Sequence, residues 1–409
     1  MDESAANFLR LLPLLGISDD VHFIRTTDPH HEKAAQEFWK RVDNNGFIYK
    51  KNYRAKYCVG CEETKTESEL VNGRCSIHPH LELEVLNEEN YFFRFSAFGE
   101  RLIRLYDDKR HNIVPDSRMT EMREFIRRGL EDFSISRLRT KMAWGVAVPD
   151  GPDHVMYVWF DALVNYISTL GWPEDLANFE KFWDCGTPTQ YCGKDNTRFQ
   201  SVMWQAMLMA ADLPPTHTVI VNGFVTGEGG VKMSKSLGNV VNPVDVVENY
   251  GRDALRYFMA REIGSFEDSP FTMARFKNSY NTHLANGLSN LVSRIMKMAS
   301  THLEVPIDAQ QTGLPADFQK ALDLFDIHTA ANVVWKQISD TDQLIQEKAP
   351  FKLIKTERAA AIEIIKHLCV RLDAIARMLS PILPETSTAI KALVHNNKMP
   401  ERPLFERKE

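Results

Sequence analysis

The sequence predicts an α/β part followed by an all-α part. Between about Val155 and Thr226, short apolar runs alternate with a helical pattern, and this alternation is typical of a parallel α/β sheet. The apolar runs are 154–160, 189–192 and 217–221, and the helical pattern covers 199–211. After about Met273 the apolar residues recur at helical spacing, so we expect the two parts to meet near that residue.

Two stripes of apolar residues predict a helical bundle in the second part. Their members recur three or four residues apart, which places them on one face of a helix. The stripes are Leu284, Leu288, Leu291 and Ile295, and Ile365, Leu368, Leu372, Ile375 and Leu379. Pro381 and Pro384 end the second stripe because proline interrupts helical hydrogen bonding.

Length and composition indicate a folded protein of more than one domain. The 409 residues are 44% hydrophobic and 25% charged, which excludes fibrous and disordered classes. A single core stops growing near roughly 250 to 300 residues. The net charge of -6 means that a nucleic acid would have to meet local basic patches. No uncharged apolar run approaches the roughly 20 residues that cross a bilayer, so we expect a cytoplasmic protein without a membrane partner.

Four residues have the spacing of metal ligands. Cys58, Cys61, Cys75 and His78 form C-x2-C, a gap of 13 residues and C-x2-H. Two tight turns joined by a hairpin can bring three sulfurs and one imidazole around a tetrahedral ion, which predicts structural Zn²⁺. Because protein atoms fill all four positions, the ion would stabilise the fold rather than perform chemistry. A surface loop without an ion is the alternative, and His80 is a conceivable replacement ligand.

A glycine-rich loop with two lysines, GEGGVKMSKSLGN, occupies residues 227–239. Such a loop can close over a triphosphate, and Lys232 and Lys235 can place positive charge where phosphate is displaced. A basic loop alone is more often a solvated turn, but the full string KMSKSLGNVV is more specific. It resembles the second signature of the class I aminoacyl-tRNA synthetases, in which this loop grips ATP during amino-acid activation.

Five further segments narrow the resemblance to the methionyl type of these synthetases. They follow the order of that family and are HFIRTTD at 22–28, ENYFFR at 89–94, YVWFDAL at 157–163, GKD at 193–195 and GRDALRYF at 251–258. The likeness runs from about residue 7 to about residue 390. It implies activation of methionine by ATP with Mg²⁺ through a methionyl-adenylate, followed by transfer of the methionyl group to tRNA.

The resemblance implies an incomplete Rossmann-type parallel sheet, a zinc-binding connective insertion and an α-helical anticodon-binding bundle. The ligands of such a sheet bind at the carboxyl ends of its strands. The expected segments are a remnant of the first half of the nucleotide-binding domain at 1–48, the connective insertion at 49–152, the second half at 153–226, the lysine loop and stem-contact region at 227–274, and the anticodon-binding domain at 275–409.

The resemblance also implies residues for the amino-acid and ATP sites. Trp159, Ala162 and Tyr166 would line a pocket for the polarizable thioether of methionine. Ordinary core packing is the alternative for the two aromatic residues. The residues expected to bind ATP or the adenylate are Gly193, Asp195, Lys232, Met233, Ser234, Lys235 and Ser236, and the two lysines would stabilise phosphate charge.

Two positions of the expected pocket depart from the family pattern. The family usually reads GKDI-x-x-FH, whereas this chain has Asn196 and Gln200 in place of the apolar residue and the histidine. Buried amides must find hydrogen-bond partners. We therefore expect a more polar amino-acid pocket than the family pattern gives.

The motif H-x-G-H does not occur in these 409 residues. In class I enzymes it opens a helix after the first strand and stabilises the ATP phosphates. The opening LLPLLGISDD resembles a later part of that domain. We therefore expect this chain alone to form little adenylate. An incomplete gene model, an enzyme completed by a separate N-terminal chain and a degenerate protein that keeps RNA binding are the three explanations.

The helical part contains the expected tRNA-binding residues. Asn286, Asn290 and Arg294 repeat every four residues and form a polar stripe on one helix. The resemblance implies that Asn290 and Arg294 contact anticodon bases. Phe351 follows Pro350 where the family has a Pro-Trp pair, and its ring could stack on an unpaired base. A solvated helix face and plain core packing are the alternatives.

Two other functions remain open from the sequence. One is a class I synthetase of the isoleucyl, valyl or cysteinyl type, against which the compact zinc insertion and the tRNA-binding residues argue. The other is a tRNA-binding module with a dead active site. Methionine-dependent pyrophosphate exchange would separate this module from an active enzyme.

Overall fold

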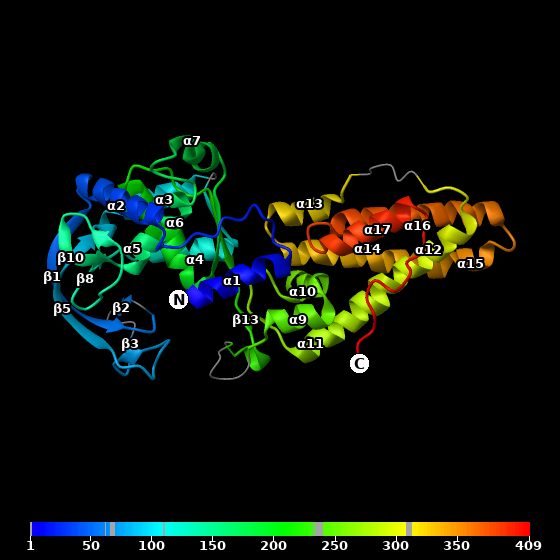
Figure 1. The fold of residues 1–409 in the computed structure, drawn as a ribbon, viewed down its shortest axis with the longest axis horizontal. Helices are drawn as coiled ribbons and strands as arrows, with labels where there is room; N and C mark the ends of the chain where they lie inside the picture. The colour runs from blue at the N-terminus through cyan, green and yellow to red at the C-terminus, as the bar shows by residue number, and fades with distance from the viewer. Residues whose placement is uncertain are drawn as a thin grey trace. The chain divides into compact units, whose positions relative to one another are not determined.

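A computed structural model describes residues 2–61, 63–65, 70–108, 111–231, 233, 240–307 and 313–409. The chain divides into two compact units. We call His22–Val221 the mixed unit, and we call Met1–Val21 together with Asn222–Glu409 the helical unit (Figure 1). In the described residues, no helix is long and apolar enough to cross a membrane.

The mixed unit contains helices and all but two of the assigned strands. Its helices are α2 (Pro29–Asn44), η2 (Phe95–Phe98), α3 (Gly99–Asp107), α4 (Asp116–Arg127), α5 (Val158–Ala162), α6 (Asn165–Ser168), α7 (Leu176–Phe179), η3 (Glu180–Asp184), η4 (Lys194–Asn196), η5 (Phe199–Met203) and α8 (Trp204–Ala210). Its strands are β1 (Ile48–Cys58), β2 (Glu63–Lys65), β3 (Leu70–Val71), β4 (Arg74–Cys75), β5 (Glu84–Phe93), β6 (Asn112–Val114), β7 (Phe133–Ser134), β8 (Ser136–Leu138), β9 (Ala147–Val148), β10 (Gly151–Met156), β11 (Thr189–Gly193) and β12 (Thr218–Asn222).

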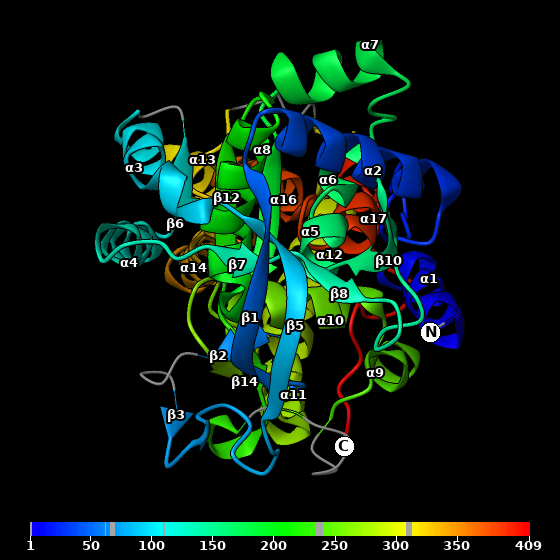
Figure 2. The same ribbon diagram turned by 90° about the vertical axis from the view of Figure 1, so that its left-hand side faces the viewer.

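A long antiparallel ribbon of β1 and β5 leads to the predicted metal site. The two strands pair from Ile48 opposite Phe93 to Tyr57 opposite Glu84, and they lie side by side in Figure 2. They form the centre of a sheet with the order β2-β1-β5-β7. Because β1 ends at Cys58, the ribbon places the first predicted ligand at its far end.

The predicted α/β sheet is present, but one of its strands was assigned wrongly. The runs at 189–192 and 217–221 form β11 and β12, which share a sheet with the order β11-β12-β6, and β12 is parallel to β6. The run at 154–160 does not join this sheet. Its first three residues are the end of β10, which pairs antiparallel with β8 and β9, and the chain then turns into α5 at Val158. A short apolar run fits a strand and a buried helix equally well, so periodicity could not separate them.

The core of the mixed unit is rich in aromatic rings around α2. This helix begins at Pro29, whose fixed φ suits the first helical position. Its apolar face places Phe38 against Trp204 at 5.6 Å between ring centroids and against Phe160 at 6.0 Å. Trp39 contacts Phe160 from the next position of the helix at 5.2 Å. These contacts fix α5, which carries Trp159, and α8, which follows Gln200, to one core.

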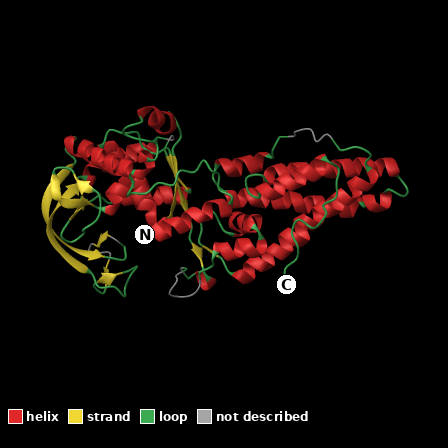
Figure 3. Ribbon diagram, viewed as in Figure 1, coloured by secondary structure: helices red, strands yellow, loops and turns green. Residues whose placement is uncertain are grey.

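The helical unit contains helices and two short paired strands. Its helices are α1 (Asp2–Leu15), η6 (Glu228–Gly230), α9 (Pro243–Tyr250), α10 (Arg252–Tyr257), η8 (Phe258–Glu262), α11 (Met273–Ser279), η9 (Tyr280–Ser289), α12 (Asn290–His302), α13 (Ala316–Asp323), α14 (Ile327–Lys348), α15 (Pro350–Leu353), α16 (Arg358–Leu379) and α17 (Pro384–His395). The strands β13 (Val225–Thr226) and β14 (Ser269–Pro270) pair in parallel. Figure 3 shows the helices of this unit in red.

The predicted bundle is confirmed by the burial of both apolar stripes. Every member of the two stripes is at most 1% exposed. The helices that carry them, η9 with α12 and α16, pack with α14 and α17 (Figure 1). Asp326 caps α14 by accepting a hydrogen bond from the Thr329 backbone at 3.0 Å. The second stripe ends with α16 at Leu379, and α17 begins at Pro384, as the proline positions predicted.

Candidate functional site

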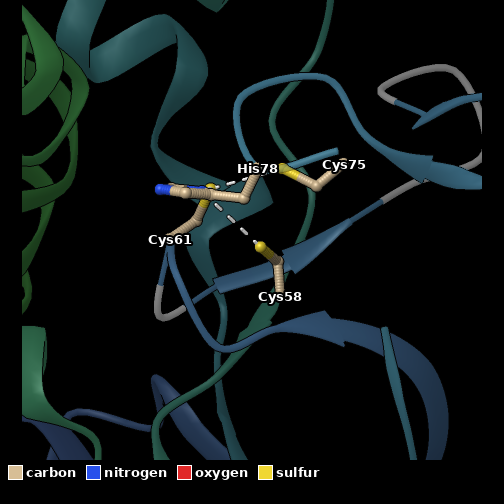
Figure 4. A group of neighbouring side chains, drawn as sticks. All are labelled: Cys58, Cys61, Cys75 and His78. Carbon is tan, nitrogen blue, oxygen red and sulfur yellow. Dashed lines mark hydrogen bonds between the residues drawn. The ribbon is translucent and has the colours of Figure 1, made fainter. Parts of the chain in front are cut away.

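The four predicted metal ligands lie together at the end of the β-ribbon. Their ligand atoms are all within 4.8 Å of one another (Figure 4). The Cys61 sulfur lies 3.5 Å from the Cys75 sulfur and 3.2 Å from Nδ1 of His78, and the Cys58 sulfur lies 3.8 Å from the same nitrogen. We call these four residues the Cys3His cluster. His80 is outside it.

The backbone of the Cys3His cluster follows from two local features. Asn72 and Gly73, both with positive φ, form the two-residue turn between β3 and β4, and this turn brings Cys75 back toward β1. Gly60 packs so closely against the His78 ring that a Cβ at this position would lie 2.7 Å from the imidazole. A side chain at residue 60 would therefore displace the only nitrogen ligand of the cluster.

The donor set and its spacing fit a tetrahedral zinc ion. Ligands about 2.0 to 2.3 Å from Zn²⁺ in a tetrahedron lie about 3.3 to 3.8 Å apart. The separations of 3.5, 3.2 and 3.8 Å are close to this range. Burial, together with the hydrogen bonds of this thiol with Cys75 and Cys58, raises the pKa of the Cys61 thiol to about 12. A dication would reverse this effect, since a thiol that coordinates a metal is deprotonated.

A second group of side chains gathers around α5, α6 and η5. Trp159 stacks on Phe199 with 4.2 Å between ring centroids and 12° between the rings. Tyr166 shares a side-chain hydrogen bond with Gln200, the next residue after Phe199. We call Trp159, Tyr166, Phe199 and Gln200 the aromatic–glutamine cluster. Phe199 was not among the predicted site residues, although an aromatic ring beside Gln200 in the sequence was a usable signal.

The aromatic–glutamine cluster contains buried polar atoms without a partner. Gln200 is 5% exposed, and its Oε1 has no hydrogen-bond partner in the described part of the chain. The same holds for Nε1 of Trp159. Burial raises the pKa of the Tyr166 phenol, although the hydrogen bond with Gln200 lowers it in part. Buried polar atoms without a hydrogen-bond partner are costly, so they favour a ligand or water in contact with them.

A buried hydrogen-bond network holds the turn that carries Gln200. The wide turn η5 is a π-helix, and the side chain of Gln205 donates to the Gln200 carbonyl oxygen at 2.9 Å. Gln205 also donates to the Thr216 hydroxyl at 3.0 Å and accepts from the Thr216 backbone N–H at 2.9 Å. Thr216 in turn donates to Gln190 of β11 at 2.9 Å. This network was not predicted from the sequence, because its members are separated along the chain.

The other described residues that were predicted for the amino-acid and nucleotide sites are less buried than Gln200. Ala162, Gly193 and Asn196 are half-buried, and Asp195 is exposed at the start of the 3-10 helix η4. Asp161 lies between Trp159 and Ala162 in sequence and is 7% exposed. Burial raises the pKa of the Asp161 carboxyl to about 7. Asp161 is therefore the buried acid nearest in sequence to the aromatic–glutamine cluster.

The lysine loop is described only in part. Gly229 and Gly230 have positive φ, and the Gly227 N–H donates to the Val231 carbonyl at 2.7 Å. Met233 is half-buried and packs against the core of the helical unit. Four predicted residues of this loop lie outside the described residues: Lys232, Ser234, Lys235 and Ser236.

The predicted RNA-binding residues are accessible on the bundle. Asn286 and Asn290 are exposed, one helical turn apart across the η9–α12 boundary. Arg294 is one third exposed, and its guanidinium donates to the carboxylate of Asp342 on α14. Phe351 is 48% exposed at the start of α15, so plain core packing does not explain this ring.

The comparisons with known proteins all indicate the same family. The family described as "tRNA synthetases class I (M)" matches residues 1–80 and 58–296. The chain is 38% identical to a methionine–tRNA ligase of Nostoc over 95% of this chain and 76% of the relative. It is 39% identical to a methionine–tRNA ligase of Caldanaerobacter subterraneus over 89% of this chain, and there it spans only 59% of the relative.

A solved structure has the same fold. It is Mycobacterium tuberculosis methionyl-tRNA synthetase in complex with methionyl-adenylate, with a TM-score of 0.86 and 32% sequence identity. The match covers 98% of this chain and 85% of that chain. The free form of the same enzyme matches with a TM-score of 0.84.

Proposed function

The chain belongs to the class I methionyl-tRNA synthetases, and from this premise we propose that it activates methionine with ATP and transfers the methionyl group to tRNA. The observation that carries the proposal is the match of nearly the whole chain, 98%, to a synthetase bound to methionyl-adenylate. The identity of 38% to a methionine–tRNA ligase supports the same amino acid.

We propose that the aromatic–glutamine cluster is the methionine pocket. Trp159, Tyr166 and Ala162 would contact the side chain of the amino acid, and sulfur interacts favourably with aromatic rings. The buried unpaired atoms of Trp159 and Gln200 support a ligand or a bound water in contact with them. Asn196 would form a more polar part of the same pocket.

The side-chain amide of Gln200 adds a buried hydrogen-bond acceptor, Oε1, to the proposed pocket. The thioether of methionine has no hydrogen-bond donor, so it cannot satisfy the free Oε1 of Gln200. A water molecule bound beside the methionine side chain would satisfy this oxygen without displacing the ligand. We therefore expect methionine to bind together with one ordered water.

We propose that Gly193 and Asp195 contribute to the binding of ATP with Mg²⁺ and that residues of the lysine loop bind its phosphates. The proposed loop residues are Lys232, Met233, Ser234, Lys235 and Ser236. The two ammonium groups would stabilise the charge that develops on the phosphates as pyrophosphate leaves. Amino-acid activation would then depend on positioning and electrostatics, without a covalent enzyme intermediate.

We propose that the Cys3His cluster holds a structural zinc ion. The support is the set of three sulfurs and one imidazole at tetrahedral separations. The zinc ion would crosslink the turns after β1 and β4, and Cys58, Cys61, Cys75 and His78 would be its ligands. The side chains of these residues would have no part in the chemistry of ligation.

We propose that the helical unit binds the anticodon of tRNA. Asn290 and Arg294 would contact unpaired bases, and the exposed ring of Phe351 would stack on one of them. The five segments expected from the sequence remain our proposal for the domain boundaries, and the cytoplasm, where translation factors act, remains the proposed location.

Amino-acid-dependent exchange of labelled pyrophosphate into ATP tests the activation step. Purified chain is assayed with methionine, isoleucine, valine and cysteine in parallel. Exchange with methionine alone would support the proposal, and it would overturn the expectation that this chain needs a separate H-x-G-H segment. Exchange with another of the four amino acids would contradict the proposed specificity.

Binding measurements test the function independently of catalysis. The chain is titrated with methionine and, separately, with methionine tRNA and a tRNA of different anticodon. We expect methionine to bind and the methionine tRNA to bind at least about tenfold more tightly than the other tRNA. Failure of both would contradict the proposal, whereas selective tRNA binding without methionine binding would favour the RNA-binding module.

A further inference from the structure

We propose that Tyr106 is a positioning residue for the proposed methionine pocket, because its hydroxyl holds the wide turn that carries Gln200. This inference rests on the proposed function of the aromatic–glutamine cluster and deepens it by naming a residue outside the cluster that fixes the cluster. Tyr106 belongs to α3 and is 6% exposed. Its hydroxyl donates a hydrogen bond to the backbone carbonyl of Ser201, the residue after Gln200.

The turn η5 is a π-helix, and side chains from outside it bind two of its successive carbonyl oxygens. The Gln200 carbonyl accepts from Gln205 at 2.9 Å, and the next carbonyl, that of Ser201, accepts from Tyr106. Turns of this kind interrupt the regular helical hydrogen-bond ladder and are frequent at functional sites. Because Gln200 and Ser201 are adjacent, a shift of the Ser201 carbonyl would also move the backbone that carries the Gln200 side chain.

Burial makes the bond from Tyr106 important for the conformation of η5. It raises the pKa of the Tyr106 phenol, so the hydroxyl keeps its proton and remains a donor. Ser201 is 0% exposed, so its carbonyl lies in the same buried environment. A buried carbonyl that loses a donor costs free energy, and a shift of the backbone is one way to recover a partner.

A second helix fixes the backbone of Tyr106. The guanidinium of Arg123 on α4 donates to the Tyr106 carbonyl and also to the carboxylate of Asp107, the latter at 2.7 Å. The strand between the two helices in sequence, β6, pairs in parallel with β12, and Figure 2 shows it beside both helices. Tyr106 therefore contacts η5 from elements that are bound to each other and to the sheet.

Two further contacts from this region reach η5 or residues bound to it. Nδ1 of His111, just before β6, donates to the Thr216 carbonyl at 3.0 Å, and the Thr216 hydroxyl accepts from Gln205. The guanidinium of Arg198, the N-cap residue of η5, lies over the ring of Phe125 on α4, 4.6 Å from its centroid. Support from α3, α4 and the chain before β6 therefore reaches both η5 and the network that holds it.

Ordinary core packing of Tyr106 predicts a different behaviour. Its ring belongs to the core of the mixed unit, so loss of the hydroxyl would then lower stability and leave the methionine affinity of the folded chain unchanged. If Tyr106 positions Gln200, the affinity depends on the hydroxyl, and this dependence requires the Gln200 side chain.

Calorimetric titration of the full chain with methionine tests the proposal. Tyr106→Phe removes only the hydroxyl, and we expect the Kd for methionine to rise about tenfold. The matched control is Tyr49→Phe, which removes a hydroxyl that donates to Asp132 at 2.9 Å in the same unit and should bind like the wild type. Urea unfolding shows that each variant is folded during the titration.

A double-mutant cycle separates positioning from general destabilisation. Gln200→Met keeps the volume of the side chain but removes its amide. In this background Tyr106→Phe should raise the Kd by less than about threefold, because the group that Tyr106 positions is gone. An equal effect of Tyr106→Phe in both backgrounds would show that Tyr106 does not act through Gln200.

Hydrogen exchange gives a second readout that needs no ligand. The Trp204 N–H donates to the Phe199 carbonyl across η5, and its exchange should be faster in Tyr106→Phe than in the wild type or in Tyr49→Phe. His111→Ala removes the bond to Thr216 and should weaken methionine binding about threefold. This variant decides the question if Tyr106→Phe does not fold.

The outcomes separate this inference from the proposed function. Wild-type methionine affinity in both Tyr106→Phe and His111→Ala, or unchanged exchange in η5, would overturn the role of Tyr106 and leave the proposed function standing. No binding of methionine by the unchanged chain would contradict the proposed function, and the exchange of the Trp204 N–H would then still decide whether Tyr106 holds the turn.

Discussion

The Cys3His cluster and the aromatic–glutamine cluster belong to the same mixed unit, but they are assembled in different ways. All ligands of the first come from one short segment, Cys58 to His78, and two tight turns bring them together. The second joins α5, α6 and η5, and a buried network reaching Thr216 holds it. A local site can therefore be understood from spacing alone, whereas a pocket between helices depends on what fixes those helices.

Loss of the proposed zinc ion should have the largest effect, and this effect should stay local. Structural zinc contributes roughly 10 to 16 kcal/mol of apparent binding free energy in small zinc peptides. We expect Cys61→Ser to lose the bound metal and to open the turns after β1 and β4 to protease. Metal content by atomic absorption and mass spectrometry of the cleavage sites measure both effects.

The matched control for this variant is Cys185→Ser, because Cys185 is an exposed free cysteine outside the Cys3His cluster. It should keep one zinc ion per chain. Equal metal content in the wild type and Cys61→Ser would contradict the zinc assignment.

The region around the aromatic–glutamine cluster should instead respond to pH through Asp161. Its folded-state pKa of about 7 lies above the ordinary value of 3.8, so the folded chain holds this proton more tightly than the unfolded chain. The resulting stabilisation is complete below about pH 4 and is lost as the pH rises through 7. We expect Asp161→Asn to be more stable than the wild type at pH 8, by up to about 4 kcal/mol, and similar to it at pH 4.

Urea unfolding at the two pH values measures this difference, and Asp195→Asn, at an exposed position, serves as the control. A constant difference between Asp161→Asn and the wild type from pH 4 to pH 8 would show that Asp161 does not titrate in this range.

Loss of the hydrogen bonds of Gln205 should destabilise the proposed methionine pocket, although Gln205 is not one of its residues. Gln205→Met keeps the volume but removes the side-chain hydrogen bonds to the Gln200 carbonyl and from the Thr216 N–H. We expect a loss of about 2 to 4 kcal/mol in unfolding free energy and weaker methionine binding. Gln319→Met, at an exposed position of α13, is the control. Normal methionine affinity in Gln205→Met would mean that the network does not position the pocket.

Removal of the stacked ring should have the smallest effect of the four. Trp159→Ala removes the contact with Phe199, and we expect the Kd for methionine to rise about 30-fold, which corresponds to about 2 kcal/mol. Trp144→Ala is the matched control, because this tryptophan is 62% exposed. Calorimetric titration gives both constants, and equal affinity of the two variants would argue for core packing of Trp159.

The fold was predictable from the sequence wherever a residue pattern is compatible with only one type of secondary structure. Both apolar stripes of the bundle are buried, and the prolines after Leu379 end the helix where expected. The run at 154–160 is different, because a short apolar run has no period that separates a strand from a helix. The strand β6, only three residues long, gave no signal at all, although it completes the parallel sheet.

The candidate site likewise contains features that were predictable from the sequence and features that were not. The grouping of the four side chains of the Cys3His cluster was predicted in full, because their spacing is local. The contact of Trp159 with Phe199 and the bonds from Gln205 to Thr216 were not, because they depend on how α5, η5 and α8 pack around α2. The resemblance to a family placed Trp159, Tyr166 and Gln200 in one expected pocket, which spacing alone could not have done.

A crystal structure of the chain with a non-hydrolysable methionyl-adenylate analogue tests the central claim most directly. We predict that the methionine side chain lies between Trp159 and Tyr166, with one ordered water on Oε1 of Gln200. Density for the analogue at a site away from these three residues would contradict the assignment of the aromatic–glutamine cluster as the methionine pocket.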